Sequence, residues 1–153
     1  MSSDLQQLYQ QIILDHAKAR HGAGLAEAPA GDLVGEAHML NPTCGDELTL
    51  RASVHASGEA LTVSGISWEG QGCSISMASA SVLHDLAVGR DRQALLGLME
   101  DFRTVMRSRG SIEADEEILG DAAAFSGVSR YPARVKCAML AWVALEEALP
   151  GAE

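Results

Sequence analysis

The feature that most constrains the fold of this chain is a run of alternating residues at positions 47–55. Leu48, Leu50, Ala52 and Val54 are apolar, and each is flanked by polar or charged residues. A period of two is typical of a β-strand with one buried face, because successive side chains point to opposite faces of a sheet. The pair Ser57 and Gly58 follows and predicts a hairpin turn into a second strand.

The returning strand changes its phase part-way along. Leu61 and Val63 share one phase, whereas Ile66 and Trp68 share the other. Gly65 lies where the phase changes, and a glycine at such a point indicates a β-bulge. A short mixed segment at 35–41 precedes the alternating run and is expected to add a strand. The sequence therefore predicts a small three-stranded antiparallel sheet.

Apolar residues at helical spacing predict helices before and after this sheet. Residues 22–34 are rich in Gly, Ala and Pro and are expected to form a loop. Residues 111–128 are acidic, with a helix start expected near position 115, and Pro132 suits the first turn of a last helix. We expect an α+β fold with the helices packed on one side of the sheet. The helix over residues 4–19 is predicted from Leu5, Leu8, Tyr9, Ile12, Ile13 and His16, and the helix from position 73 is predicted from Ile75, Ala78, Val82 and Leu86. A helix ending near position 110 is predicted from Leu95, Met99, Phe102 and Met106, and the last helix is predicted from Val135, Met139, Trp142 and Leu149.

Length and composition limit the class of protein. A chain of 153 residues fits one domain over residues 1–153, and aromatic residues at 4% imply an aliphatic, alanine-rich core. No apolar run approaches membrane-spanning length, and no basic region followed by an apolar stretch opens the chain, so we expect a cytoplasmic protein with no membrane partner. The formal charge of −10 argues against a nucleic-acid partner, because such binding depends on Lys and Arg neutralising phosphates.

A short turn before the alternating run carries a thiol and a carboxylate. Pro42 restricts its own backbone and that of Asn41, whereas Gly45 permits a bend that other residues resist. With the backbone turned there, the sulfur of Cys44 and the carboxylate of Asp46 are expected to converge on one point.

Cys73 and Cys137 complete a candidate metal set with Cys44 and Asp46. Three sulfurs and one carboxylate oxygen suit tetrahedral zinc. The three cysteines are widely spaced without a Cys-x-x-Cys pair, which in a reduced cytosol indicates metal or thiol chemistry. Three unrelated buried cysteines remain the alternative. The position of Cys137 off the centre of the last helix's apolar stripe favours the metal site.

The other polar candidates are expected to have structural roles. His16 and His21 are expected at the surface or a helix end, and His84 is expected to be structural rather than a ligand. Arg134 and Lys136 flank Cys137 in sequence and belong to a cluster of cations in one third of the chain. Two explanations stay open for them, a solvated face or an edge that docks a partner.

Four motifs together resemble the SufU branch of the IscU-like iron–sulfur assembly proteins over nearly the whole chain. This resemblance implies an IscU-like fold, and it puts Cys44, Asp46, Cys73 and Cys137 on the family's metal-binding positions. The motifs are Ile13-Leu14-Asp15-His16, Asn41-Pro42-Thr43-Cys44-Gly45-Asp46, Gly70-Gln71-Gly72-Cys73-Ser74-Ile75-Ser76 and Tyr131-Pro132-Ala133-Arg134-Val135-Lys136-Cys137-Ala138.

Two features resemble SufU more than the scaffold-type relatives. Scaffold-type relatives carry a histidine directly before the third cysteine, where this chain has Lys136, and they lack the additional segment at about 108–128. SufU members bind zinc and accept sulfur from the cysteine desulfurase SufS, and the sulfur then passes towards the SufBCD assembly machinery. The resemblance therefore implies one zinc per chain, with SufS and SufBCD as partners.

Three functions remain open from the sequence. The first is a zinc-dependent sulfurtransferase, the second a scaffold on which a [2Fe–2S] cluster assembles, and the third a zinc-stabilised module without thiol chemistry. For the first function we expect Cys44 to accept the sulfur, because Cys73 begins one helix and Cys137 lies within another. Cys44 is in a turn beside Gly45 and is the one of the three whose backbone is able to move without breaking a helix.

Overall fold

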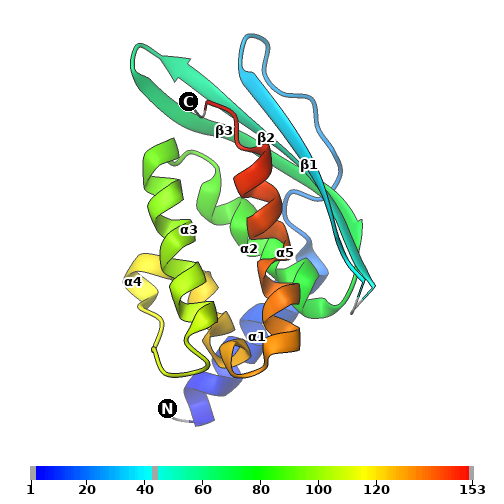
Figure 1. The fold of residues 1–153 in the computed structure, drawn as a ribbon, viewed down its shortest axis with the longest axis vertical. Helices are drawn as coiled ribbons and strands as arrows, with labels where there is room; N and C mark the ends of the chain where they lie inside the picture. The colour runs from blue at the N-terminus through cyan, green and yellow to red at the C-terminus, as the bar shows by residue number, and fades with distance from the viewer. Residues whose placement is uncertain (1–2, 43–44, 152–153) are drawn as a thin grey trace.

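The computed structural model describes residues 3–42 and 45–151. Figure 1 shows that one helix comes first along the chain, followed by the strands of a sheet and then by the remaining helices. The elements are α1 (Ser3–Ala19), β1 (Leu33–Asn41), β2 (Asp46–Ser57), β3 (Ala60–Gln71), α2 (Ser74–Ala87), α3 (Arg92–Arg107), α4 (Glu116–Leu119), the 3-10 helix η1 (Gly120–Arg130) and α5 (Pro132–Ala148).

The three strands form one antiparallel sheet in the order β1-β2-β3. The expected bulge is present, because Ser53 pairs with Gly65 while Val54 pairs with Val63. Ser64 is thus the extra residue, directly beside the glycine that marked the change of phase. The α+β fold with a three-stranded antiparallel sheet is confirmed.

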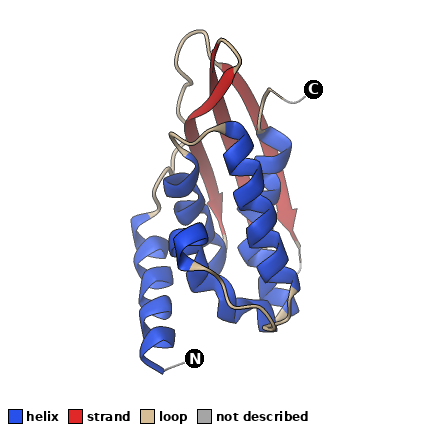
Figure 2. Cartoon of the chain, turned by 90° about the vertical axis from the view of Figure 1, so that its left-hand side faces the viewer, coloured by secondary structure: helices blue, strands red, loops and turns tan. Residues whose placement is uncertain are grey.

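The helices gather on one face of the sheet, as Figures 1 and 2 show. α5 packs against β1 and β2, α2 packs against β3 and α5, and α1 packs against α2 and η1. A side chain at Gly35 would have its Cβ only 1.8 Å from the carbonyl oxygen of Ala148. The glycine in β1 therefore permits the close approach of the α5 C-terminus to the sheet.

The core consists of the alternating face of β2 and the inner faces of the helices. Leu48, Leu50, Ala52 and Val54 are all buried, as the period of two predicted. Most of the few aromatic rings are buried, and Phe102 stacks on Trp142 with ring centroids 4.0 Å apart. Within the described residues, no helix has both the length and the apolarity needed to cross a membrane.

The predicted apolar stripe of the last helix is confirmed only in part, since Trp142 and Leu149 are buried as expected. Val135 and Met139 are only half-buried, whereas Cys137, Ala138 and Ala141 are buried. Small alanine side chains let α5 lie close to α2, and this contact is fixed by Ser79, whose hydroxyl donates to the Ala138 carbonyl at 2.6 Å. Cys137 therefore lies on the buried face, and its expected offset from that face no longer supports a metal site.

His16 was expected at the surface or at a helix end; it lies in the last turn of α1, but it is not at the surface, because only 7% of this residue is exposed. Its two ring nitrogens lie 2.8 Å from Ser81 Oγ and 3.0 Å from Asp121 Oδ2. α2 and η1 cover the last turn of α1, and the sequence had not indicated η1. His84 is half-buried and pairs with Asp85 at 3.0 Å.

Candidate metal centre

Three of the four predicted ligands come together from three separate elements. Asp46 begins β2, Cys73 lies directly before α2, and Cys137 lies in α5. One ligand atom from each residue lies within 4.8 Å of the others. Zn–S bonds of about 2.3 Å require ligand separations of roughly 3.8 Å in a tetrahedron, so shifts of about 1 Å or less would close the set.

Asp46 is held in place by the start of α2. Only 1% of the residue is exposed, its Oδ1 accepts a hydrogen bond from the Cys73 N–H at 3.0 Å, and its Oδ2 accepts one from Ser76 Oγ at 2.6 Å. A carboxylate at the N-terminus of a helix is also stabilised by the helix dipole. The first residue of β2 thus caps α2, which lies 27 or more residues further along the chain.

Gly72 has the backbone position that this cap requires. A Cβ at Gly72 would lie 2.3 Å from Asp46 Oδ1 and 2.9 Å from its Cγ. No side chain fits there without moving the carboxylate. The Gly-x-Gly-Cys pattern therefore has a steric reason at Gly72, directly after the end of β3.

The two described thiols have different surroundings. Cys73 is exposed and forms the N-cap residue of α2, with its Sγ 3.4 Å from Ser76 Oγ. Cys137 is buried, and its Sγ lies 4.0 Å from Asn41 Nδ2 and 3.8 Å from the Ala133 carbonyl oxygen. Asn41 ends β1, so the turn that follows it in sequence starts beside Cys137.

Cys44 lies outside the described residues, and its roles as ligand and sulfur acceptor stay predictions. Arg134 and Lys136 are both exposed, and neither forms an ion pair within the described part of the chain. The Arg134 guanidinium lies 5.7 Å from the centre of the Tyr131 ring. Their docking role is likewise still a prediction.

The donor set fits zinc better than a hard cation. Two sulfurs and a carboxylate oxygen are ligands that zinc accepts, whereas magnesium and calcium take oxygen ligands. Sequence reasoning missed Ser76 and Asn41, which contact Asp46 and Cys137. Ser76 had a weak signal, because a serine three residues after an N-cap position faces the same helix end.

His16, His21 and Asp85 also bring ligand atoms within 4.8 Å of one another. Each of these side chains already has a polar partner, since His21 Nδ1 lies 2.7 Å from Asp85 Oδ2 and both nitrogens of His16 are engaged. This group is a hydrogen-bonded contact of α1 and the turn after it with α2 and η1.

Comparison with known proteins identifies the family. The model of the NifU-like N terminal domain matches residues 8–148. The chain belongs to this family. It is 40% identical over 147 residues to a zinc-dependent sulfurtransferase, SufU, of Bacillus subtilis, across 95% of this chain and 92% of that one. It is 33% identical to an iron–sulfur cluster assembly scaffold protein, IscU, of Streptococcus pyogenes, across 96% and 86% of the two chains.

A solved structure supports the same assignment. A putative iron–sulfur cluster assembly scaffold protein for the SUF system, from Fervidobacterium islandicum, is 34% identical and superposes with a TM-score of 0.69, covering 94% of this chain and 97% of the other. The resemblance to SufU and IscU proteins is confirmed, and the chain is an iron–sulfur cluster assembly protein of the SufU and IscU family. The names of these relatives differ on the step that each performs.

Proposed function

We propose that this protein is a zinc-dependent sulfurtransferase that accepts persulfide sulfur from SufS and passes it towards SufBCD. The observation that carries the proposal is the convergence of Asp46, Cys73 and Cys137, whose ligand atoms lie within 4.8 Å of one another. The identity of 40% with a relative named as a zinc-dependent sulfurtransferase supports the same step.

Two of the proposed ligands, Asp46 and Cys137, are held in place by hydrogen bonds or by burial. Asp46 is held by Cys73 N–H and Ser76, and Cys137 is buried within α5. A zinc ion bound by these residues and Cys44 would keep the sulfurs deprotonated and fixed in position. Cys44 lies outside the described residues, and the described residues on either side of it, Pro42 and Gly45, belong to no helix, with a φ of +71° at Gly45.

In the transfer step, the thiolate of Cys44 attacks the outer sulfur of the persulfide on the donor. A new S–S bond forms as the donor's S–S bond breaks, and the donor cysteine leaves as a thiolate. No external oxidant or reductant is needed, because the sulfur atom moves from one thiolate to another. The persulfide on Cys44 then delivers its outer sulfur to the next acceptor in the same way.

The decisive experiment maps where sulfur arrives. The protein is incubated with SufS and cysteine, and peptides are analysed by mass spectrometry for the addition of one sulfur atom. We expect the persulfide on Cys44 and about one zinc per chain. Persulfide found mainly on Cys73 or Cys137, in protein that still holds zinc, would refute the assignment to Cys44.

A scaffold for a [2Fe–2S] cluster is the second candidate, and the relatives named as scaffold proteins favour it. Three cysteines and one aspartate would also bind iron. Visible absorption of freshly purified protein separates the two functions. Colourless protein with zinc supports the sulfurtransferase or a zinc-stabilised module, which the persulfide mapping then separates, whereas brown protein with cluster absorption supports the scaffold.

A further inference from the structure

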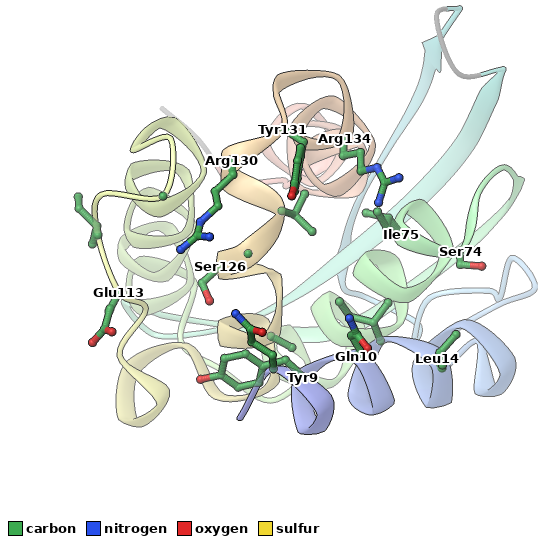
Figure 3. Close-up of a pocket in the computed structure, with 17 residues that line it drawn as sticks. Tyr9, Gln10, Leu14, Ser74, Ile75, Glu113, Ser126, Arg130, Tyr131 and Arg134 are labelled. Atoms are coloured by element: carbon green, nitrogen blue, oxygen red, sulfur yellow. The ribbon is translucent and has the colours of Figure 1, made fainter. Parts of the chain in front are cut away.

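A groove of about 600 Å³ lies between α1 and the segment that leads into α5. In Figure 3, Tyr9, Gln10 and Leu14 of α1 face Ser126, Arg130, Tyr131 and Arg134 across it. Ser74 and Ile75 line one end, and they directly follow Cys73 in sequence. The groove therefore begins beside the candidate metal centre and extends away from it.

Two arginines line the groove without an ion pair. Arg130 and Arg134 are exposed, and neither guanidinium has a hydrogen-bonded or ion-paired partner within residues 3–42 and 45–151, although that of Arg134 lies over the Tyr131 ring. The chain has 21 acidic and 11 basic residues, so unpaired arginines are not due to a shortage of carboxylates. Glu113 also lines the groove and forms no ion pair with either arginine.

Arg130 is positioned by the fold. A Cβ at Gly110 would lie 2.6 Å from Arg130 Cγ and 3.0 Å from its Nε. Gly110 has a φ of +83°, and at this glycine the backbone lies directly against the aliphatic part of the Arg130 side chain. The stem of Arg130 is thus packed against Gly110, while the residue as a whole stays exposed.

Ser126 supplies a second polar group to the groove. The residue is 5% exposed, and its Oγ has no hydrogen-bond partner among the described residues. Buried polar atoms in native proteins are normally hydrogen-bonded, and a hydroxyl is able to donate to a carboxylate. Figure 3 shows the Ser126 side chain directed from η1 towards α1, on the same side as Arg130.

The rim of the groove is apolar and exposed. Leu14, Ile112 and Tyr131 are 49%, 41% and 57% exposed, and all three line it. Large apolar side chains gathered around polar groups are typical of surfaces that bind other proteins. A free small carboxylate would use the arginine and the hydroxyl but not this rim.

We propose that the groove docks an acidic, partly apolar peptide segment of a protein partner. A carboxylate of the segment accepts hydrogen bonds from Arg130 and Ser126, and its apolar side chains pack on the rim. Because one end of the groove adjoins Cys73, the docked partner is brought to the candidate metal centre. Identifying this partner with the sulfur donor rests on the proposed function, whereas the binding itself does not.

Peptide binding to the full-length protein tests the proposal. The probe is a short capped peptide of alternating leucine and glutamate, and its control replaces glutamate by glutamine. Calorimetry and backbone amide shifts are measured at low ionic strength. We expect the glutamate peptide to shift amides along residues 126–134 and to bind at least about tenfold more tightly than the glutamine peptide.

Three variants assign the binding to the groove. Arg130→Glu should lower the affinity for the glutamate peptide by at least about tenfold. Ser126→Ala should lower it by about threefold. Arg107→Glu makes the same charge change on an exposed arginine of α3 that does not line the groove, and it should leave the affinity unchanged. Circular dichroism and melting of each variant verify that the fold is intact.

Equal affinity for the two peptides, or unchanged affinity in Arg130→Glu, would overturn the proposal. Glutarate binding as tightly as the peptide would also overturn it, because the site would then be a pocket for small carboxylates. Persulfide mapping is a separate experiment with a separate outcome. Peptide binding without sulfur transfer from SufS leaves the groove in place and removes the sulfurtransferase.

Discussion

Replacing Ser76 by alanine tests whether Asp46 is positioned by α2. The hydroxyl of Ser76 donates to Asp46 Oδ2 at 2.6 Å, and only 2% of Ser76 and 1% of Asp46 are exposed. A buried hydrogen bond to a charged group contributes about 1.5–3 kcal/mol. We therefore expect Ser76→Ala to lower the free energy of unfolding by about 2 kcal/mol, which corresponds to roughly 4–8 °C in melting temperature for a chain of this size.

Zinc affinity should fall as well, although no predicted ligand is changed. Partners that orient a metal ligand typically change metal affinity by about 10–100-fold when removed. Competition with a chromophoric chelator measures this affinity, and urea unfolding of metal-free protein measures the stability separately. The stability loss should persist without metal, because the hydrogen bond belongs to the folded chain.

Ser74→Ala is the matched control. Ser74 is an exposed serine in the same helical turn, and no hydrogen bond to its side chain is found within the described chain. We expect its stability to change by less than about 0.5 kcal/mol. If the two variants unfold and bind zinc alike, the reasoning that α2 holds Asp46 is refuted.

Three further predictions concern the glycine beside the site, a buried tyrosine and the docking cations. Gly72→Ala puts a Cβ 2.3 Å from Asp46 Oδ1, so urea unfolding should show a free energy of unfolding lower by about 1–3 kcal/mol, together with less bound zinc. As the control, Gly97→Ala in α3 places a Cβ with nothing within 4 Å and should raise the free energy of unfolding by about 0.5–1 kcal/mol. Burial and a hydrogen bond to Glu116 raise the pKa of Tyr9 from 10.0 to about 12, so its contribution to stability is complete below pH 10 and is lost as the pH rises towards 12; Tyr9→Phe should remove this dependence from unfolding curves. Charge reversal at both Arg134 and Lys136 should reduce the activation of SufS and the salt dependence of that activation while zinc content stays unchanged, and equal activation would exclude this edge from docking.

Local patterns were sufficient to predict the sheet. The alternation from Leu48 to Val54, the turn at Gly58 and the bulge beside Gly65 all depend on neighbours in sequence, and the structure has each of them. The start of α5 at Pro132 likewise follows from the fixed φ of proline. Such features are set by the chain's own geometry, so no distant contact is needed to read them.

Helix faces were predicted less well where alanine dominates. The buried face of α5 includes Ala138, Ala141 and Ala144, whereas the larger Val135 and Met139 are only half-buried. Alanine is small enough for either environment and carries little periodic signal, so the partner helix decides which face is covered. The same holds for His16, which is buried because α2 and η1 lie over the end of α1.

The sequence by itself determined which residues are available for metal chemistry and which elements carry Asp46, Cys73 and Cys137. Only the tertiary structure decided that these three side chains meet, since β2, α2 and α5 come together through packing of the helices on the sheet. It also decided that Ser76 and Cys73 N–H hold Asp46. Contacts between distant segments depend on the closure of the whole core, and no local periodicity encodes them.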